Sequence, residues 1–366
     1  MVKRAMLDHT APDSLTSARP DGQSPTILIV TDAWRPQLNG VVHTLEELAR
    51  SMADEGVEVV FLTPEKFATV PLPSYPEIRL AIASKRRVLA EIEAIAPDYI
   101  HIATEGPLGM AARRACLKRQ LPFTTAYHTR FPEFISARLP IPESWSYWWL
   151  RRFHNAGEGM MVATKSLGAE MAARGFNRIK RWSRGVDTKQ FDPVKRRDLG
   201  LPRPVFLNVG RVAVEKNLPA FLELDLPGSK VVVGDGPDLA TLRQRYQDVH
   251  FLGRKSGEDL AMLYASADVF VFPSRTDTFG NVMLEALASG IPVAAFPVTA
   301  PRDVLGDAGA LSEDLRAAAL AALDIPRDVA LSRAATYSWR ACALEFLGNL
   351  TRVPRGAFAA RRLSLR

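Results

Sequence analysis

The feature that most constrains the fold of this chain is a regular alternation of short apolar runs with helical patterns. The first run, 26–30, leads through a turn-rich stretch into a helical pattern over 41–55, and a second apolar run follows at 57–62. Short apolar runs bounded by turn residues predict buried strands, and apolar residues three and four apart predict helices packed on them. Strand–helix–strand repeats of this kind predict an α/β fold with parallel sheets.

The alternation runs in two blocks, and the second begins near residue 204. Further strands are expected at 99–102, 123–126, 160–163, 205–209, 230–233, 249–252, 269–272 and 292–295. Further helices are expected at 90–96, 107–119, 166–174, 218–224, 238–246, 258–265, 282–289, 311–323 and 339–350. The prediction is therefore two doubly wound, Rossmann-like domains. Each has its crevice at the carboxyl ends of its strands, and we expect the two crevices to face one interdomain cleft.

The length of 366 residues also favours two domains, because one hydrophobic core rarely serves so long a chain. A polar, charged stretch over 184–203 with two prolines marks the expected linker. The sequence predicts a disordered tail over 1–24 and a first domain over 25–185. A second domain over 186–335, a closing helix over 336–352 and a basic tail over 353–366 follow.

Composition excludes several classes of protein. The two cysteines, Cys116 and Cys342, are too few for a disulfide scaffold or a cysteine-based zinc site, and they favour a reducing compartment. No run approaches the roughly 18 apolar residues that span a membrane. The polar start of the chain lacks the apolar core of a signal peptide. We therefore expect a cytoplasmic protein.

The net charge of +7 is unevenly distributed. Residues 130–200 carry 14 Lys and Arg against 7 acids, and 352–366 carry five Arg and no acid. Such basic regions predict a polyanionic partner, which is a membrane leaflet, a nucleic acid or a phosphate-bearing ligand. The chain has no helix-turn-helix, RNP or zinc-finger motif, so we expect no nucleic-acid partner.

Two glycine-containing turns follow predicted strands. In 210–217 the cations Arg211 and Lys216 precede a helix, where they can converge on a diphosphate. A solvated charged loop is the alternative. The turn 234–237 has two glycines, but Leu239 stands where a dinucleotide fingerprint needs a third, which disfavours an NAD(P)-binding oxidoreductase and leaves a plain strand-to-helix turn.

The segment 273–293 carries the most information. The residues 278–281 would start a helix and offer backbone N–H groups to a phosphate. Asp277 before the turn can accept hydrogen bonds from sugar hydroxyls, and Glu285 can hold a ribose diol. Taken alone, the two acids also fit a helix cap and a solvated helix residue.

The spacing Asp277-x7-Glu285 with Phe279 and Gly280 resembles the Glu-x7-Glu signature of retaining glycosyltransferases of family 4, which have the GT-B fold. The family's first acid is usually Glu, and here it is Asp. The matching segments occur in the family's order, at 39–41, 128, 184–187, 210–216, 234–237 and 277–285. The resemblance covers roughly 26–350. Within this family, the chain is similar to the branch that contains sulfoquinovosyl- and glycosyl-diacylglycerol synthases and GDP-mannose-dependent α-mannosyltransferases.

The resemblance implies a nucleotide sugar on the C-terminal domain and an acceptor on the N-terminal domain, with the closing helix packed back on the latter. It implies that Arg211 and Lys216 grip the diphosphate, Asp277 contacts the sugar and Glu285 holds the ribose. It places His128 at the reacting centre. The remaining donor contacts that it implies are Gly40 over the phosphates, Gly253 and Arg254 at the base, and Thr278, Phe279, Gly280 and Asn281 at the sugar and phosphate.

The implied chemistry is a retaining, front-face displacement in which cations and N–H dipoles stabilise the leaving diphosphate. We expect no metal and no cofactor, since the chain has no Asp-x-Asp and its six histidines have no His-x3-His spacing. A non-catalytic sugar-nucleotide-binding protein is an alternative, but it would be expected to lose His128, Lys216 or Asp277, and all three are present.

The segment 145–153 has five aromatic residues and two arginines. The residues predicted to contact the acceptor or a membrane are Trp145, Trp148, Trp149, Arg151 and Arg152. An aromatic helix packed on the domain core, or lining a soluble acceptor site, is the alternative. The predicted function is hexosyl transfer to a hydroxyl of a membrane lipid such as diacylglycerol, on the inner face of the plasma membrane. The second candidate is a GDP-mannose-dependent α-mannosyltransferase with a lipid or glycan acceptor.

Overall fold

A computed structural model describes residues 24–37, 39–72, 75–132 and 142–358. The chain divides into two compact units. Unit 1 comprises Met1–Ala163, Gly168–Ser183 and Trp339–Arg366, and unit 2 comprises Thr164–Leu167 and Arg184–Ser338. The predicted tail over 1–24 lies outside the described residues except for its last residue, as does the predicted basic tail from residue 359 on.

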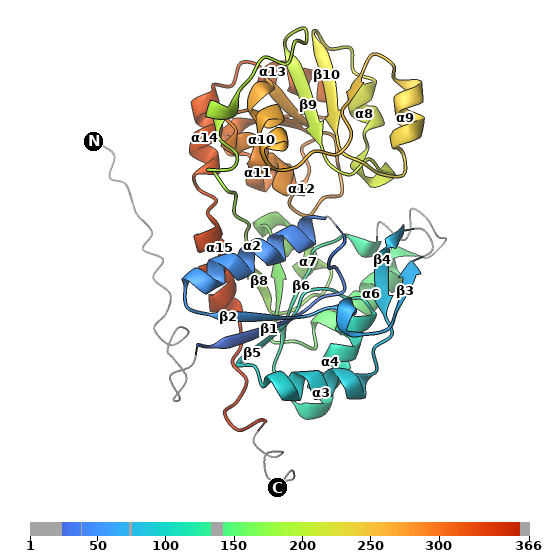
Figure 1. Cartoon of the computed structure of the whole chain (residues 1–366), viewed down its shortest axis with the longest axis vertical. Helices are drawn as coiled ribbons and strands as arrows, with labels where there is room; N and C mark the ends of the chain where they lie inside the picture. Colours follow the sequence, from blue (N-terminus) through green and yellow to red (C-terminus); the bar gives the residue numbers. More distant parts are fainter. Residues whose placement is uncertain (1–23, 38, 73–74, 133–141, 359–366) are drawn as a thin grey trace, which may run out of the picture. The chain divides into compact units, whose positions relative to one another are not determined.

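Unit 1 is built on a six-stranded parallel sheet with the strand order β2-β1-β5-β6-β7-β8 (Figure 1). Its strands are β1 (Thr26–Val30), β2 (Glu58–Leu62), β5 (Tyr99–Ile102), β6 (Thr124–Ala126), β7 (Gly159–Val162) and β8 (Ile179–Arg181). Every residue of β1 is buried, as expected for an apolar strand covered on both faces. A separate antiparallel hairpin joins β3 (Thr69–Leu72) to β4 (Tyr75–Ala81).

Helices cover both faces of this sheet. They are α2 (Gly40–Asp54), α3 (Lys85–Ile95), α4 (Pro107–Arg119), α6 (Glu143–His154), most of α7 (Lys165–Ala173) and α15 (Trp339–Asn349), with a short 3-10 turn η1 (Pro64–Lys66). The last helix, α15, packs against α2 and β8, and Figure 1 shows it beside α2. Its Phe346 contacts Trp182 and His101 in an aromatic cluster.

Unit 2 has a second six-stranded parallel sheet, with the order β11-β10-β9-β12-β13-β14. Its strands are β9 (Val205–Val209), β10 (Ser229–Val233), β11 (His250–Phe251), β12 (Val269–Phe272), β13 (Val293–Ala295) and β14 (Gly309–Leu311). Its helices are α8 (Pro219–Leu222), α9 (Leu239–Arg245), α10 (Gly257–Ser266), α11 (Asn281–Ala288), α12 (Thr299–Val304), α13 (Leu315–Ala322) and α14 (Arg327–Ala334). Three 3-10 turns complete it, η2 (Pro193–Lys195), η3 (Val214–Lys216) and η4 (Gly306–Ala308). The α/β prediction with two doubly wound sheets is confirmed.

The predicted helix over 311–323 is wrong at its start. Leu311 ends strand β14, which pairs in parallel with β13, and the helix begins only at Leu315. The side chain of Asp314 accepts hydrogen bonds from the N–H groups of Arg316 and Ala317 and so fixes this later start. The hairpin β3–β4, strand β8 and helices α12 and α14 were not expected from the sequence.

Each sheet has one place where the strand order reverses. In unit 1 the chain runs from β1 to β2 on one side and then returns to β5 on the other side of β1. In unit 2 it runs from β9 through β10 to β11 and then returns to β12 on the other side of β9. Ligands of doubly wound sheets bind at such switch points, outside the carboxyl ends of the strands. The loops after β9 and β12 are therefore the expected ligand-binding position of unit 2.

Candidate functional site

The two loops at the switch point of unit 2 are joined by an ion pair. Lys216 ends the 3-10 turn after β9, and its Nζ lies 2.6 Å from Oδ1 of Asp277, which follows β12. The two residues are 61 positions apart in the sequence, and the structure brings them together. The Oδ2 atom of Asp277 is buried and accepts no hydrogen bond from the residues that the structure describes. A cation and a carboxylate with unused acceptor capacity thus lie where a polar ligand would bind.

Side-chain hydrogen bonds also tie the two loops together. Asn217 adopts a left-handed conformation (φ 53°) that ends the turn, and its Nδ2 donates to the carbonyl of Pro273, 3.0 Å away. The hydroxyls of Ser274 and Thr276 both lie 3.4 Å from the carbonyl of Glu215. These bonds hold the loop with Lys216 against the loop with Asp277.

Arg211 follows β9 in the first of these loops and is half-buried. The loop rests on the neighbouring turn 234–237: a Cβ on Gly234 would lie 1.8 Å from the carbonyl oxygen of Gly210, and one on Gly236 would lie 2.3 Å from that of Val212. Both glycines are therefore required for close packing of two turns, which accounts for this motif without a dinucleotide.

The helix α11 starts at the second loop. Gly280 precedes it in the left-handed region (φ 84°), and a Cβ there would lie 3.0 Å from atoms of Phe272 and Met283. Phe279 is buried, with the guanidinium carbon of Arg184 5.9 Å from its ring centroid. Thr278 and Asn281 are half-buried on either side. The first N–H groups of a helix have no acceptor within it, so this end of α11 favours an anion.

Glu285 lies just over one turn into α11. Its Oε2 accepts a hydrogen bond of 2.8 Å from the hydroxyl of Tyr264 in α10. Burial, followed by the charge and the hydrogen bond of Glu285, raises the pKa of Tyr264 well above its ordinary value, so the phenol stays protonated and donates. Sequence reasoning missed Tyr264, because a tyrosine on an amphipathic helix has the pattern of a core residue.

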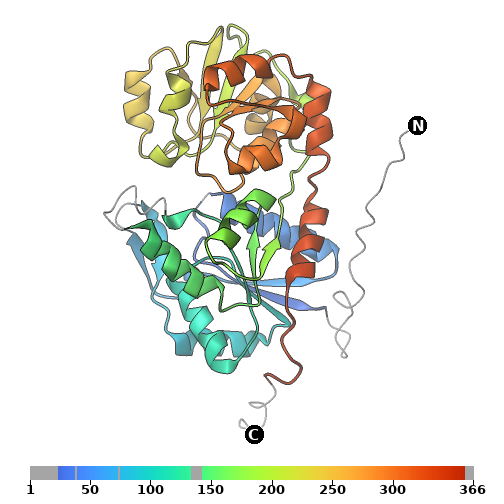
Figure 2. The same ribbon diagram turned by 180° about the vertical axis from the view of Figure 1, so that it is seen from behind.

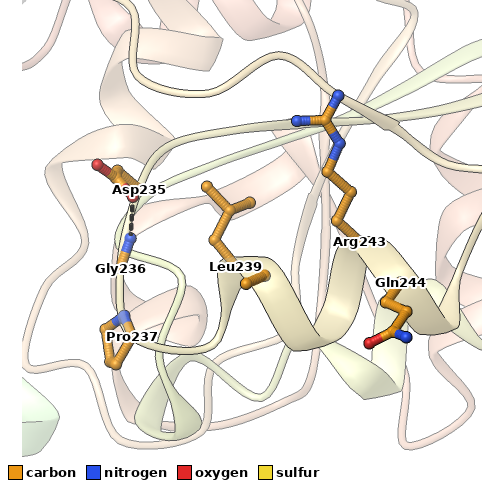
Figure 3. Close-up of a pocket in the computed structure, with 7 residues that line it drawn as sticks. Asp235, Gly236, Pro237, Leu239, Arg243 and Gln244 are labelled. Atoms are coloured by element: carbon orange, nitrogen blue, oxygen red, sulfur yellow. Dashed lines mark hydrogen bonds between the residues drawn. The ribbon is translucent and has the colours of Figure 1, made fainter.

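The remaining predicted donor residues follow β11. Gly253 has a left-handed conformation (φ 65°), its carbonyl accepts from the N–H of Gly234 at 2.9 Å, and Arg254 is exposed. A cavity of about 570 Å³ lies at the turn 234–237 and the helix α9 that follows it (Figure 3). Its lining residues are Asp235, Gly236, Pro237, Leu239, Ala240, Arg243 and Gln244, none of which was predicted to contact a donor.

The predicted reacting histidine belongs to unit 1. His128 follows β6, is half-buried, and lies edge-on to Trp182 with ring centroids 5.6 Å apart. Two residues later, Arg130 donates two parallel hydrogen bonds of 2.7 Å to Glu170 of α7. These bonds lower the pKa of Glu170, against the opposing effect of burial. The pair anchors the loop that carries His128 to a helix.

Gly40 was predicted in a loop, but it is the first residue of α2. The side chain of Asn39 caps this helix and accepts from the N–H groups of Val41 and Val42 at 3.0 Å. Gly40 is exposed at the helix start.

At the switch point of unit 1 a protein carboxylate fills the position that a ligand would take. Asp32 follows β1 and accepts from the N–H groups of Leu108 and Gly109 at the start of α4, at 2.8 and 3.1 Å. Burial raises the pKa of Asp32, although these hydrogen bonds oppose the rise. A Cβ on Gly106 would lie 2.4 Å from the Asp32 carboxyl carbon, so glycine is required there.

Helix α6 carries the predicted aromatic segment and has two different faces. Tyr147, Leu150 and Phe153 are buried. The tryptophans are exposed on the other face, Trp145 by 72%, Trp148 by 58% and Trp149 by 39%. The segment thus both packs on the core and presents indole rings to the surface.

The two predicted arginines of α6 behave differently. Arg151 donates to the carbonyl of Arg174 at 3.1 Å, whereas Arg152 is exposed. Figure 2 shows α6 beside α4, and Arg113 of α4 donates to the carbonyls of Phe153 and Arg152. Burial and the nearby charges of Arg152 and Arg114 lower the pKa of Arg113. The guanidinium groups of Arg113, Arg114 and Arg152 are therefore close enough for their charges to interact.

Among the described residues, no three His, Cys, Asp or Glu side chains are grouped so that they could hold a metal ion. Within the same part of the chain, the helices are too short or too polar to cross a membrane.

Comparison with known proteins gives matches along most of the chain. The model "Glycosyltransferase Family 4" matches residues 38–190, and the model "Glycosyl transferases group 1" matches residues 203–325. A GDP-mannose-dependent alpha-mannosyltransferase of Mycobacterium tuberculosis is 29% identical over 306 residues, which cover 76% of this chain and 81% of that protein. An alpha-monoglucosyldiacylglycerol synthase of Streptococcus pneumoniae is 26% identical over 73% of this chain and 70% of its own length.

The solved structure of a sucrose-phosphate synthase from Thermosynechococcus elongatus has the same fold. It aligns with a TM-score of 0.68 and 20% identity, covering 88% of this chain and 97% of that one.

Proposed function

The chain belongs to the family 4, group 1 glycosyltransferases with the GT-B fold, and from that premise we propose its donor, its acceptor and the residues that act on them. The proposed reaction moves a hexose from a nucleoside-diphosphate sugar to a hydroxyl of a membrane lipid such as diacylglycerol. One observation carries the donor side of this proposal: the Lys216–Asp277 pair at the switch point of unit 2, with Glu285 on the helix that follows.

The donor residues have separate proposed roles. Lys216 and Arg211 hold the diphosphate, and the start of α11 at Thr278–Asn281 adds N–H dipoles to it. Asp277 accepts hydrogen bonds from hydroxyls of the sugar. Its buried Oδ2 atom can do so, because it accepts no hydrogen bond from the described residues. Glu285 accepts from the ribose. The exposed Arg254 beside Gly253 faces the base, and Gly40 at the start of α2 approaches the phosphates.

The proposed chemistry is retaining and needs no metal or cofactor. The bond from the anomeric carbon to the diphosphate breaks, the acceptor oxygen bonds to that carbon on the same face, and the acceptor proton passes to the departing phosphate. Negative charge grows on the diphosphate, so preorganised cations stabilise the transition state more than the ground state. Lys216 and Arg211 supply that charge. His128 of unit 1 is the proposed residue at the reacting centre.

On the acceptor side, we assign α6 and the neighbouring middle of α4 to contact with an anionic bilayer. Indole rings favour the interface between lipid and water, and guanidinium groups favour anionic headgroups. Trp145, Trp148 and Trp149 of α6 are all exposed. The positive charges of Arg114 and of Arg152 at the end of α6 act on Arg113 of α4, so the two helices also carry a group of cations. The occurrence of a diacylglycerol synthase among the relatives supports a lipid acceptor. Peripheral association with the cytoplasmic face of a membrane follows from the proposal.

The donor is tested with UDP-glucose, UDP-galactose and GDP-mannose, each offered with vesicles that contain diacylglycerol. Transfer to lipid from a UDP-sugar supports glycolipid synthesis. Transfer from GDP-mannose alone supports the second candidate, an α-mannosyltransferase, which the 29% identical mycobacterial relative favours. Absence of both transfer and donor hydrolysis with every sugar, from a folded protein, would contradict the proposed donor class.

The membrane contact is tested by pelleting with vesicles of phosphatidylcholine alone or mixed with phosphatidylglycerol. We expect binding only to the anionic vesicles, weaker at high salt, and lost in the double variant Trp145→Ser, Trp148→Ser. The matched control is Val194→Ser, since Val194 is 74% exposed and belongs to unit 2, whereas α6 belongs to unit 1. If the double variant and the control pellet equally, α6 does not form the membrane contact.

A further inference from the structure

We propose that Tyr264 is a positioning residue that fixes the carboxylate of Glu285 for the ribose of the donor. The inference rests on the proposed function, because it takes Glu285 as the ribose ligand. Tyr264 lies on α10 and Glu285 on α11, two neighbouring helices of unit 2 (Figure 1). The phenol hydroxyl donates to Oε2 of Glu285 at 2.8 Å. Tyr264 would therefore act on the ribose through Glu285.

The ring of Tyr264 is held in one position. It is fully buried, it packs edge-on to Phe191 with centroids 5.5 Å apart, and it lies 5.7 Å from the ring of Phe270. A buried phenol needs a hydrogen-bond partner, and here the partner is the carboxylate. This packing fixes the position of the hydroxyl oxygen at the end of the ring.

A fixed donor restricts the carboxylate that accepts from it. A free glutamate side chain samples several rotamers, and fixing them at binding reduces affinity. A carboxylate has about four acceptor sites, so one bond from Tyr264 sets its orientation without using its whole capacity. The bond thus prepares Glu285 for a bidentate contact with the 2′ and 3′ hydroxyls before the nucleotide arrives.

The same unit contains a matched pair for comparison. Tyr246, at the end of α9, donates to Oε1 of Glu223 at 2.7 Å, and it is also buried. This pair lies where helices α8 and α9 end, whereas the site loops lie where helices begin. Tyr246→Phe therefore removes the same hydroxyl from a tyrosine–glutamate pair outside the proposed site.

The experiment measures binding of UDP and GDP, and of their 2′,3′-dideoxy analogues, by titration calorimetry of the full chain. For Tyr264→Phe we expect the Kd of whichever ribonucleotide binds the wild type to rise about tenfold, the size expected for a hydrogen bond to a charged group. The dideoxy Kd should change less than twofold, and kcat at saturating donor should stay within twofold while KM rises. Tyr246→Phe should alter none of these values.

Equal losses with the ribo and dideoxy nucleotides, or an unchanged Kd, would overturn the positioning role. Glu285→Gln separates this failure from that of the proposed function. If Glu285→Gln leaves the Kd unchanged, the ribose assignment fails; if it raises the Kd and Tyr264→Phe does not, only the role of Tyr264 fails. Should Tyr264→Phe fail to fold, Phe191→Leu loosens the ring while keeping the hydroxyl and is judged by the same ribo-to-dideoxy ratio.

Discussion

Replacing Lys216 with methionine tests the ion pair on which the donor site depends. Methionine keeps an unbranched apolar side chain of similar length and removes the ammonium group. The Lys216 and Asp277 side chains are 30% and 21% exposed, and Nζ and Oδ1 are 2.6 Å apart. Solvent screens a pair of this exposure, so we expect its loss to cost only about 0.5–1 kcal/mol of folding free energy. For a unit of this size, the melting temperature should fall by roughly 1–4 °C.

The effect on transfer should be far larger. If Lys216 neutralises charge on the departing diphosphate, its loss removes an interaction that strengthens in the transition state. Loss of one such preorganised group typically lowers kcat about 100- to 1,000-fold, which corresponds to roughly 3–4 kcal/mol. The measurement is initial-rate transfer from saturating nucleotide sugar, with circular dichroism melting of the same preparation.

The control for this experiment is Asp248→Asn. Asp248 pairs with Lys230 at 3.2 Å near the amino end of β10, whereas the site lies at the carboxyl ends of β9 and β12. It should change the melting temperature by a similar small amount and leave kcat unaltered. A Lys216→Met enzyme with kcat within threefold of wild type would refute the proposed role of the ion pair. A collapse of its melting temperature by more than about 10 °C would refute the reasoning on stability.

Three further predictions concern the framework of the two units. Gly234→Ala places a Cβ 1.8 Å from the Gly210 carbonyl and should cost at least ~2 kcal/mol, measured by urea unfolding; an unchanged midpoint would contradict this packing. Burial raises the pKa of the Cys116 thiol from 9.0 to about 12, so the thiol of the unfolded chain loses its proton at a lower pH than that of the folded chain. The free energy of unfolding should therefore fall as pH rises from 9 to 12, by up to about 1.4 kcal/mol per pH unit. Cys116→Ala should flatten that dependence, and an equal slope would count against it. Glu170→Gln removes the anchor of Arg130 and should lower kcat several-fold without changing donor Kd, whereas a purely structural role would lower only the melting temperature.

Much of the fold could be predicted because buried parallel strands are apolar on both faces. The runs at 99–102, 205–209 and 269–272 match observed strands at both ends. The hairpin β3–β4 was missed because Pro71 lies within it, and proline argues against a strand in a central sheet. An isolated two-stranded hairpin has room for it. The start of α13 was missed because Ala and Leu occur in both helices and buried strands.

The site was predictable as a set of residue types, and its contacts were not. The family resemblance predicted Lys216 and Asp277 separately. Only the fold shows that these residues, 61 positions apart, meet with Nζ and Oδ1 at a distance of 2.6 Å. Arg151 was expected at the membrane, and it donates to the carbonyl of Arg174 because α7 ends beside it. Tyr264 gives no signal in the sequence, since its role depends on the neighbouring helix that carries Glu285.

The two switch points together explain why the nucleotide is assigned to unit 2. In unit 1 the N–H groups at the start of α4 already donate to the carboxylate of Asp32, and the absence of a side chain at Gly106 lets that carboxylate approach. A phosphate there would have to displace it. In unit 2 the equivalent helix, α11, begins at Asn281, and Gly280 before it has no side chain that could cap it. Lys216 lies in the neighbouring loop, paired with Asp277. Two sheets of the same topology thus differ at one position: one supplies its own anion, and the other presents a helix start and a cation to an anion from outside.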